Sequence, residues 1–378
     1  MSYIGIVAAG GNSTRTGLGG YTSKAALSVR GAPLLRHQIR FLRSSGVERV
    51  YVIAQGAHVR LLASALSTEE RSAVSFLVSD CATGWAGELE RAAAFVSPDD
   101  EVVLVSCDNL HNAPHIERLG DRQALFTFTT WARDARPTSG PVLARSQTVW
   151  GVGESVWVQR QSAGFRGDFF SGYAVVRGSL LVESLRETPR SERGEKEFTS
   201  FLEMIAKSPR CAAVPYPGTY EDVSDLRSLA LLHNGRSTYD DGPVDIGAAV
   251  LLCDQDDRVF LTRRQDGLGW VPPGGLVDRG EPLAAAALRE LREEVGVSVS
   301  EDRLRLLGVY PTSGKTGAPS CSVVFHARVE SPIDVEMSPS EVSECGWFTS
   351  GQAATLTVPF DLRAAVDDHF SGRELDVR

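Results

Sequence analysis

Residues 274–297 read GGLVDRGEPLAAAALRELREEVGV, and this stretch decides the fold of the last third of the chain. Alanine and leucine favour a helix, and Pro282 suits a helix start, where a missing N–H costs nothing. Gly296 is expected to cap the C-terminus of this helix. An apolar stripe that recurs every four residues should pack on a core, and it consists of Leu283, Ala287, Leu291 and Val295.

Three glutamates gather on another side of the expected helix. Glu290 precedes Glu293 and Glu294 by three and four residues, a spacing at which like charges repel by about a few tenths of a kcal/mol per pair. Carboxylate oxygens are the ligands that Mg²⁺ or Mn²⁺ prefers, and a cation would remove the repulsion. Arg289 can also pair with Glu293 one turn on. Taken alone, RELREE would sooner indicate a solvated helix with mixed charges.

The full spacing decides between these two interpretations. Gly275 is followed after five residues by Glu281, and Arg289 and Glu290 follow after seven more. The run then continues as L-x-E-E-x-G-V, so that every fixed position of the pattern G-x5-E-x7-R-E-U-x-E-E-x-G-U is filled, where U is a bulky aliphatic residue. This pattern is the signature of the Nudix hydrolases, and residues 245–378 resemble that family over their whole length.

The resemblance implies an α+β domain, with a mixed sheet and helices, that binds Mg²⁺ or Mn²⁺ and hydrolyses a nucleoside diphosphate linked to another moiety. The metal would neutralise the diphosphate and lower the pKa of the attacking water. Arg289 would orient a glutamate, and the choice of general base among the glutamates stays open. The implied metal ligands are Glu290, Glu293 and Glu294, with Glu281 as a further candidate.

Four more charged residues of this domain are weaker candidates. Arg263 and Arg264 stand at the end of an expected strand, where they would contact phosphates or simply be solvated. Glu341 and Glu344 are candidates for additional metal ligands.

Apolar strands and amphipathic helices alternate over roughly the first 230 residues. We expect strands at 3–9, 47–54, 75–80 and 101–108, and a helix at 32–46. This alternation predicts an α/β fold with a doubly wound, mainly parallel, Rossmann-like sheet. Ligands of such sheets bind beyond the carboxyl ends of the strands.

A glycine-rich stretch, AAGGNSTRTGLGGYTSKAAL at residues 8–27, follows the first strand. It lacks G-x-G-x-x-G, and it is not a Walker A loop because Lys24 is followed by alanine. It does supply backbone N–H groups and two cations, Arg15 and Lys24, for a polyphosphate. It resembles the signature loop of the sugar-phosphate nucleotidyltransferases, a GT-A-like NTP transferase family, whose pattern is A-G-G-x-G-T-R followed by P-K. Ser13 replaces a glycine of that pattern and Ser23 replaces its proline.

Three later segments extend this resemblance over residues 1–234. VLVSCDN ends a strand at Asp108, where the family has a metal-binding aspartate. TYEDVSDLRSLALLHN resembles the closing segment of the family and places a second metal carboxylate at Asp222. FFSGYAVV places Gly172 in the turn that binds the acceptor.

The resemblance also implies roles for these residues. Arg15 would hold the leaving pyrophosphate, and Lys24 would bridge the attacking and attacked phosphates. Asp108 and Asp222 would hold Mg²⁺ or Mn²⁺, and a phosphate nucleophile needs no general base. The implied nucleotide contacts are Ala9, Gly10, Gly11, Ser13 and Gly84.

We therefore expect a nucleotidyltransferase domain at 1–234, a linker at 235–244 and a Nudix domain at 245–378. The linker, GRSTYDDGPV, is polar and has no apolar period. The leading hypothesis is a bifunctional enzyme that transfers a nucleotidyl group from an NTP to a phosphorylated acceptor such as a sugar 1-phosphate, and hydrolyses a nucleoside diphosphate-linked compound. Two alternatives stay open. One is a cytidylyltransferase for phosphocholine-like or phosphonate acceptors with Nudix editing, and the other is a Nudix hydrolase with a nucleotide-sensing N-terminal domain.

Composition limits the partners. A net charge of -9 and a pI of ≈ 5.4 argue against nonspecific nucleic-acid binding, which depends on clustered Lys and Arg. No apolar run approaches the ~20 residues of a membrane span, and MSYIGIVAAGG does not read as a leader. We expect a cytoplasmic protein without a nucleic-acid or membrane partner, in an oligomeric state that the sequence leaves open. Its six cysteines form no CxxC pair and are expected to be buried thiols.

Overall fold

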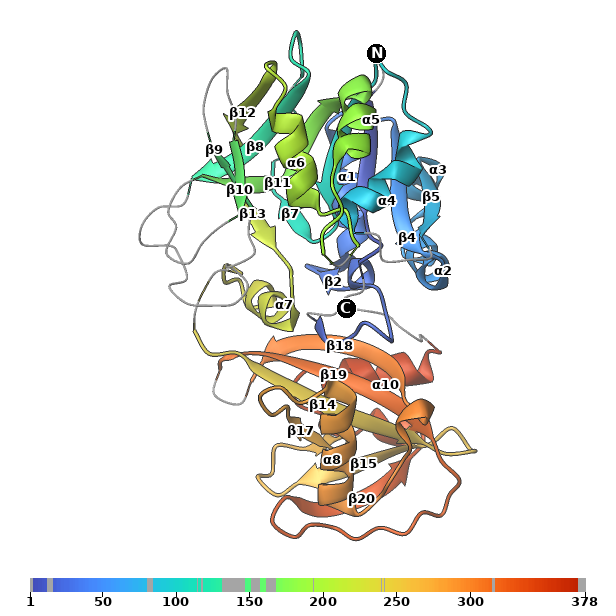
Figure 1. Cartoon of the computed structure of the whole chain (residues 1–378). Helices are drawn as coiled ribbons and strands as arrows, with labels where there is room; N and C mark the ends of the chain where they lie inside the picture. Colours follow the sequence, from blue (N-terminus) through green and yellow to red (C-terminus); the bar gives the residue numbers. More distant parts are fainter. Residues whose placement is uncertain are drawn as a thin grey trace.

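Figure 1 shows two α/β parts, one built from the N-terminal strands and helices and one from β14 onwards, with α7 (Leu226–His233) between them. This arrangement confirms the predicted fold class. Within the described residues, no helix combines the length and the apolar character that crossing a membrane requires. The computed structural model describes residues 3–11, 16–79, 84–113, 115–116, 118–130, 147–150, 157–160, 168–192, 194–238, 240, 242–314 and 317–372.

The centre of the N-terminal sheet is the parallel run β6-β1-β4-β5. Ala8 pairs with Ile53 on one side and with Ser106 on the other, so the carboxyl ends of the central strands lie level with one another. The loops that follow Ala8 and Ser106 therefore leave the sheet at the same edge, where the sequence predicts the ligand site. The central strands lie within two residues of their predicted positions: β1 (Tyr3–Ala8), β4 (Arg49–Gln55), β5 (Val74–Ser79) and β6 (Glu101–Ser106).

Beyond β6 the sheet continues with mostly antiparallel strands. β11 (Asp168–Arg177) pairs antiparallel with β6 and with β8 (Ala124–Thr130), and β8 pairs in parallel with β12 (Cys211–Pro215). β9 (Gln147–Trp150) and β10 (Trp157–Arg160) follow beside β11. The parallel centre is as predicted, whereas strand and helix alternation does not predict the antiparallel extension.

Helices cover both faces of this sheet. Ile4 and Ile6 of β1 face one apolar core and Tyr3 and Val7 face the other, because successive residues of a strand point to opposite faces. Side chains of α4, α5 and α6 close the first core, and those of α1 and α2 contribute to the second. The helices are α1 (Leu34–Ser44), α2 (Gly56–Ser64), α3 (Thr68–Ser72), α4 (Trp85–Ala93), α5 (Gly178–Glu187) and α6 (Phe198–Ala206).

The C-terminal sheet runs in the order β16-β15-β14-β19-β18, with β17 beside β14 and β20 beside β15. β14 and β19 pair in parallel and the other neighbours pair antiparallel, so the sheet is mixed, as predicted. Side chains of α8 pack on one face and those of α10 on the other. The elements are β14 (Asp245–Cys253), β15 (Val259–Arg264), β16 (Trp270–Val271), β17 (Gly274–Leu276), α8 (Leu283–Val295), η4 (Glu301–Arg303), β18 (Arg305–Ser313), β19 (Pro319–Arg328), β20 (Val342–Phe348), α9 (Ser350–Ala353) and α10 (Leu362–Phe370).

The two parts share contacts on both sides of α7. α7 packs on β18 and β19, and the Asn234 side chain that follows it donates a hydrogen bond to the Thr312 carbonyl at 2.9 Å. The ring of Tyr21, from the glycine-rich stretch, meets Phe325 of β19 edge-on at 5.0 Å between centroids. A Cβ added at Gly17 would lie 3.0 Å from Leu283 of α8. The first loop of the N-terminal part therefore rests on the C-terminal part.

The predicted linker at 235–244 packs on the end of the N-terminal part. Arg227 of α7 donates hydrogen bonds to the carbonyls of Asp240 and Gly242, each at 2.7 Å. Arg236 pairs with Asp240, and Thr238 donates to Glu221 at 2.7 Å. The polar side chains of this predicted linker thus form local hydrogen bonds, because each charged or hydroxyl side chain named here has a partner.

Candidate active sites

Lys24 and Asp108 meet at the carboxyl edge of the N-terminal sheet. Asp108 follows β6, and Lys24 opens a short 3-10 helix, η2 (Lys24–Ala26), whose N-cap is Ser23. The Lys24 ammonium donates a hydrogen bond to the Asp108 carboxylate, and the Ser106 hydroxyl donates another. Burial alone would lower the pKa of Lys24, but the charges of Asp108 and Asp222 outweigh it and raise that pKa.

Asp222 reaches the same place through a two-stranded ribbon. β13 (Tyr220–Asp222) pairs antiparallel with β7 (Asn109–His111), and this register puts Asp222 opposite Asn109, the residue after Asp108. The backbone N–H of Val223 donates to the Asp108 carbonyl at 2.8 Å. The structure therefore brings together Lys24, Asp108 and Asp222, three residues that the sequence places in one site.

Gly172 is required where β11 passes this site. Its φ of +90° lies in the region that favours glycine, and β11 has an irregularity between Phe170 and Ala174. A Cβ at this position would lie 2.5 Å from the side-chain oxygen of Asn109. Gly172 thus allows close approach of β11 to the residue next to Asp108, and its contact with an acceptor stays a prediction.

The predicted nucleotide-binding residues lie around the first loop. The N–H of Ala9 donates to the Ile53 carbonyl at 2.8 Å, and the Gln55 side chain donates to the Gly10 carbonyl at 3.0 Å. Gly11 has open space at its Cβ position, so the backbone there is accessible. Ser13 and Arg15 lie outside the described residues. The contacts of this loop with nucleotide stay predictions.

Gly84 precedes α4 with a φ of +79°, and its missing side chain leaves room for the Lys196 carbonyl. Packing is thus one reason for a glycine at this position. His111 and His115, four residues apart, are a weak metal-site hypothesis, because Pro114 interrupts any helix between them. In the structure His111 ends a strand and its ring is stacked on Phe41, so it belongs to an aromatic cluster.

In the C-terminal part, α8 ends as the sequence indicates and begins one residue later than expected, because Pro282, expected at the first helical position, has an extended backbone. Pro282 occupies the N-cap position, one residue before the helix, and Gly296 has a φ of 71° at the C-cap. The predicted stripe of Leu283, Ala287, Leu291 and Val295 is buried on the core side.

Arg289 is the centre of an ion-pair network on α8. Its guanidinium binds both oxygens of Glu281 at 2.9 Å and one oxygen of Glu290 at 2.6 Å. The predicted pair with Glu293 is present but longer, at 3.3 Å. The hydrogen bonds from Arg289 lower the pKa of Glu281 to about 2. Because Glu281 is fully engaged here, its observed role is to hold Arg289, and its role as a metal ligand stays a prediction.

Glu294 is the carboxylate that lacks such compensation. It is 9% exposed, and its Oε2 atom is buried and has no hydrogen-bond partner in the described part of the chain. Burial, and then the charges of Glu290 and Glu341, raise the pKa of Glu294 to about 8, although the Gly274 N–H donates to it. A buried oxygen without a donor, beside further carboxylates, fits a divalent cation as the missing partner.

The neighbours of Glu294 divide into near and remote groups. A Cβ on Gly275 would lie 2.5 Å from Glu290 Oε1, so Gly275 makes room for that carboxylate. Glu341 acts on Glu294 through its charge, whereas the exposed Glu344 pairs with Arg263 at 3.4 Å. The Glu293 side chain is 55% exposed. Within the described residues, no three carboxylates of this helix have oxygens all within 4.8 Å of one another, as mutual repulsion predicts.

A cavity of about 240 Å³ opens beside these glutamates. Gly274 and Gly275, which contact Glu294 and Glu290, form part of its wall. The Arg264 guanidinium lies 5.4 Å from the centre of the Phe360 ring and gives the cavity a cation and an aromatic face. The other lining residues are Asp245, Gly247, Ala248, Ala249, Val271, Pro272, Leu276, Gly314, Ser320, Ser322 and Leu362.

Sequence reasoning anticipated Arg264 but missed most of this lining. Phe360 comes from the segment before α10, Leu362 is the first residue of α10, and Ser320 and Ser322 come from β19. None of them belongs to a motif. The pairing of β14 with β19 and the packing of α10 on the sheet bring them to this cavity.

Comparisons with known proteins agree with this division of the chain. The family model of the MobA-like NTP transferase domain matches residues 5–199, and that of the NUDIX domain matches residues 243–368. A glucose-1-phosphate thymidylyltransferase from Bacillus anthracis has a similar fold, with a TM-score of 0.54 and 19% sequence identity, over 64% of this chain and 98% of its own. A UDP-glucose pyrophosphorylase gives a TM-score of 0.51 at 14% identity, over 62% of this chain and 98% of its own.

Curated relatives match the C-terminal part. The m7GpppN-mRNA hydrolase NUDT17 of Danio rerio is 33% identical over 153 residues, which cover 32% of this chain and 51% of the relative. The human enzyme of that name is 33% identical over 140 residues, 32% of this chain and 43% of its own length. The chain thus spans about half the length of these relatives.

An RNA pyrophosphohydrolase of Novosphingobium aromaticivorans is 32% identical over 133 residues, covering 30% of this chain and 83% of the relative. The family models and this relative bear out both resemblances that the motifs indicate. The chain belongs to the MobA-like NTP transferase family through its N-terminal half and to the NUDIX family through its C-terminal part.

Proposed function

We propose that this protein is a bifunctional enzyme. Its N-terminal domain transfers a nucleotidyl group from an NTP to a phosphorylated acceptor, such as a sugar 1-phosphate, and releases pyrophosphate. Its C-terminal domain hydrolyses a nucleoside diphosphate-linked compound. The observation that carries the proposal is the same in both domains: a cationic side chain, Lys24 or Arg289, binds carboxylates that the two sequence patterns place in one site.

In the N-terminal domain, Lys24 is the group that changes partners. It now binds Asp108, and an incoming polyphosphate would compete for it, because phosphate oxygens are strong acceptors for an ammonium group. Asp108 and Asp222 offer the oxygens that Mg²⁺ prefers and would hold it when Lys24 turns to phosphate. When bound, the metal would neutralise charge on the nucleotide phosphates. The acceptor phosphate is already anionic, so this transfer needs no general base.

In the C-terminal domain, Arg289 fixes the positions of Glu290 and Glu281, and Gly275 leaves room for Glu290. Glu294 and Glu290, with Glu341 beside them, offer the oxygens for Mg²⁺ or Mn²⁺. Bound metal would polarise the diphosphate and its attacking water. Any glutamate left without metal would accept the proton of that water, and the choice among them stays open.

The cavity supports a ligand with a small, partly apolar end. Its volume of about 240 Å³ lies below the range of roughly 300–1,000 Å³ for sites that enclose a whole drug-sized molecule. We infer that it takes one nucleoside, with Phe360 and Arg264 beside the base, while the diphosphate extends toward Glu290 and Glu294. Ser320 and Ser322 add hydroxyl groups at one side.

Capped RNA is a second candidate substrate for the C-terminal domain. Its support is the activity that the names of two relatives state, an m7GpppN-mRNA hydrolase and an RNA pyrophosphohydrolase. The net charge of -9 favours a free nucleotide over a long RNA, because RNA phosphates would be repelled. Comparing the hydrolysis rates of a short capped oligonucleotide and a free dinucleotide distinguishes the two candidate substrates.

The two reactions would be wasteful if they shared a product. Transfer followed by hydrolysis of the same conjugate would convert NTP and water to NMP and pyrophosphate. We therefore propose that the hydrolase acts on a different nucleotide, on a downstream conjugate or on wrong products as an editor. Phosphocholine and phosphonates are the alternative acceptors, since related cytidylyltransferases share the loop pattern.

The test is a product assay by phosphorus NMR and mass spectrometry with Mg²⁺. It offers each of the four NTPs with sugar 1-phosphates, phosphocholine and phosphonates to wild type, Lys24→Ala and Glu294→Gln. We expect a nucleotide conjugate that is lost in Lys24→Ala. Further accumulation in Glu294→Gln would show that the hydrolase processes that conjugate.

Absence of every conjugate, with Glu294-dependent release of NMP from nucleotides, would overturn the transferase proposal and leave a nucleotide-sensing domain. Lys207→Ala, which replaces an exposed lysine on the far end of α6, is the matched control for Lys24→Ala.

A further inference from the structure

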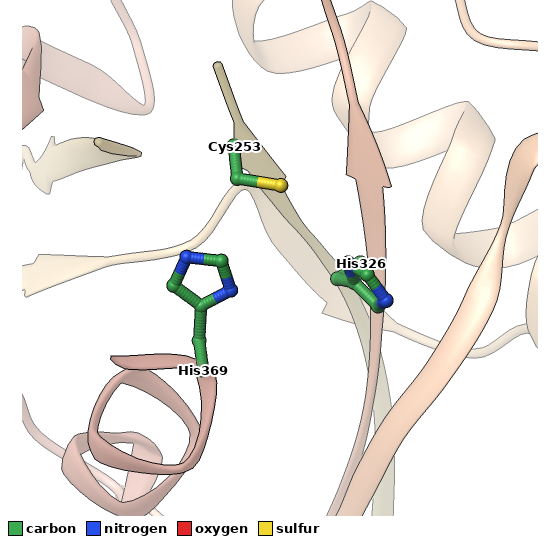
Figure 2. Close-up of side chains that lie close together, drawn as sticks. All are labelled: Cys253, His326 and His369. Atoms are coloured by element: carbon green, nitrogen blue, oxygen red, sulfur yellow. The ribbon is translucent and has the colours of Figure 1, made fainter. Parts of the chain in front are cut away.

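A group of side chains of the types that bind metal ions lies away from the carboxylate helix. Cys253, His326 and His369 each offer one ligand atom, and these atoms all lie within 4.8 Å of one another. Figure 2 shows the sulfur of Cys253 and the two imidazole rings around one common space. They come from β14, β19 and α10, and no sequence motif connects them.

The fold brings these three residues to one face of the sheet. β14 and β19 run in parallel, and Leu251 of β14 pairs with His326 of β19. Cys253 follows Leu251 by two residues and therefore lies on the same face of β14. Leu251 and Val324, two residues before His326, belong to the core that α10 covers. Val366 of α10 packs in this core, and His369 follows it by three residues, on the same side of the helix.

The chemical character of this face changes at one place. This face first carries three apolar residues that are fully or almost fully buried, Leu251, Val324 and Val366. The next residue on the same face of each element has a sulfur or an imidazole side chain. Cys253 is 0% exposed and the His369 side chain is 6% exposed. Polar groups at this depth cost free energy unless they find a partner, and the Cys253 thiol donates to the Ala327 carbonyl at 3.7 Å. The Nε2 atom of His369 is buried and has no hydrogen-bond partner within the described part of the chain.

A carboxylate lies beside these three residues. The Asp257 carboxylate lies 3.6 Å from His369 Nε2. It would act as a fourth ligand if Nε2 binds the metal, and it would orient the ring if Nδ1 does.

We propose that Cys253, His326 and His369 form a binding site for a transition metal ion of the Zn²⁺ class. One thiolate and two imidazoles favour Zn²⁺, Co²⁺ or Cu over Mg²⁺, which prefers oxygen. Tetrahedral Zn²⁺ with bonds of about 2.3 Å to sulfur and about 2.0 Å to nitrogen holds its ligand atoms about 3.3–3.5 Å apart. Rotamer adjustments of about 1 Å would bring the present atoms to that geometry. Binding would replace the proton of the Cys253 thiol, which passes to solvent.

The position of the site indicates a structural role. Ala249 lines the cavity beside the glutamates, and Cys253 lies four residues further along β14, roughly 13 Å at the strand rise. His369 is near the end of α10, whereas Phe360 and Leu362 at the other end line that cavity. A metal ion would therefore fasten α10 to the sheet and hold Phe360 and Leu362 in place.

The test is a titration of the full-length, metal-stripped protein with Co²⁺, followed by competition with Zn²⁺. Thiolate coordination gives a sulfur-to-cobalt charge-transfer absorption, which an oxygen-only site such as the glutamates cannot give. We expect one equivalent per chain with this absorption, displaced by Zn²⁺. Cys253→Ser should remove the absorption and weaken binding at this site by more than about 100-fold. Cys345→Ser, a partly buried thiol on β20, should leave both unchanged.

Folding of each variant is checked by circular dichroism. Should Cys253→Ser not fold, His369→Gln tests the same site, because it removes one nitrogen ligand, keeps the thiolate and should change the band and weaken affinity. Asp257→Asn then defines the role of Asp257. A large loss of metal affinity would identify it as a fourth ligand, and a small loss would identify it as an orienting residue. Wild type without the charge-transfer absorption, or an absorption that persists in a folded Cys253→Ser variant, would overturn the proposal.

Discussion

The two candidate active sites use cations in opposite ways. In the N-terminal site Lys24 lies between the charges of Asp108 and Asp222 and compensates them from within. In the C-terminal site Arg289 binds Glu281 and Glu290 and leaves Glu294 beside other carboxylates. The first site already contains the cation that phosphate would take, whereas in the second the buried Oε2 atom of Glu294 has no hydrogen-bond donor among the described residues. Under the proposed function, Lys24 would turn to the phosphate in one site, and a divalent cation would compensate the carboxylates in the other.

Removing the uncompensated carboxylate should have the largest effect. In Glu294→Gln we expect kcat/KM for hydrolysis of a nucleoside diphosphate-linked substrate to fall on the order of 10²–10³-fold or more, because a charged metal ligand is lost. Pyrophosphate release by the transferase should be unchanged. Steady-state kinetics of both reactions checks this, with the exposed Glu330→Gln as control. Hydrolysis at the wild-type rate in Glu294→Gln would contradict the claim that this carboxylate is needed in the second site.

Removing the internal cation should have a similar or somewhat smaller effect on the other reaction. Lys24→Ala leaves two carboxylates to repel each other and the phosphates, so we expect nucleotidyl transfer to fall on the order of 10²-fold or more. A pyrophosphate-release assay measures it. Lys24→Arg keeps the charge and separates a need for charge from a need for the compact ammonium group. Transfer at the wild-type rate in Lys24→Ala would show that this lysine is only an ion-pair partner.

The backbone beneath the N-terminal site offers a test of positioning. Gly172→Ala places a Cβ 2.5 Å from the Asn109 oxygen at a positive φ, so we expect a loss of stability of roughly 2–4 kcal/mol and displacement of Asp108. Gly120→Ala has a φ of 57° but open space, so it carries only the conformational part, roughly 1–2 kcal/mol. Denaturant unfolding compares them. Equal losses in the two variants would mean that the contact with Asn109 is unimportant.

The smallest effect is the response of stability to pH and metal. The pKa of Glu294 rises from 4.5 to about 8 on folding, so between these values the folded state binds more protons and loses stability as pH rises. Without divalent cation we expect a melting temperature of the C-terminal domain a few °C lower at pH 8 than at pH 5. Adding Mg²⁺ should raise this melting temperature more at pH 8 than at pH 5. Glu294→Gln should flatten both trends in calorimetry, and an unchanged pH response in that variant would contradict the assignment.

The parallel centre of the first sheet and the whole carboxylate helix could be predicted from the sequence, because their signals are local. Strand and helix periods located β1, β4, β5 and β6 within two residues, and the spacing from Gly275 to Val297 located α8. The meeting of Lys24 with Asp108 also followed from motif order. These features depend on residues close in sequence or on a family pattern.

The partners of the charged groups could not be predicted in the same way. Helix spacing pairs Arg289 with Glu293, one turn on. In the structure the turn before α8 brings the Glu281 carboxylate closer to the Arg289 guanidinium, at 2.9 Å against 3.3 Å for Glu293. The burial of Glu294 depends on the loop at 338–341, and the cavity depends on Phe360 from near the chain end. The grouping of Cys253, His326 and His369 requires the pairing of β14 with β19 and the docking of α10. Such contacts are set by tertiary structure.

The most direct test of the central claim, that the chain contains two separate phosphate-chemistry sites, is to measure both reactions on the same preparations of Lys24→Ala and Glu294→Gln. Phosphorus NMR follows pyrophosphate release and hydrolysis of the diphosphate-linked substrate side by side. We predict a crossed result, in which Lys24→Ala loses only transfer and Glu294→Gln loses only hydrolysis. If either variant lost both reactions while remaining folded, or if neither lost its own, the account of two separate sites would be contradicted.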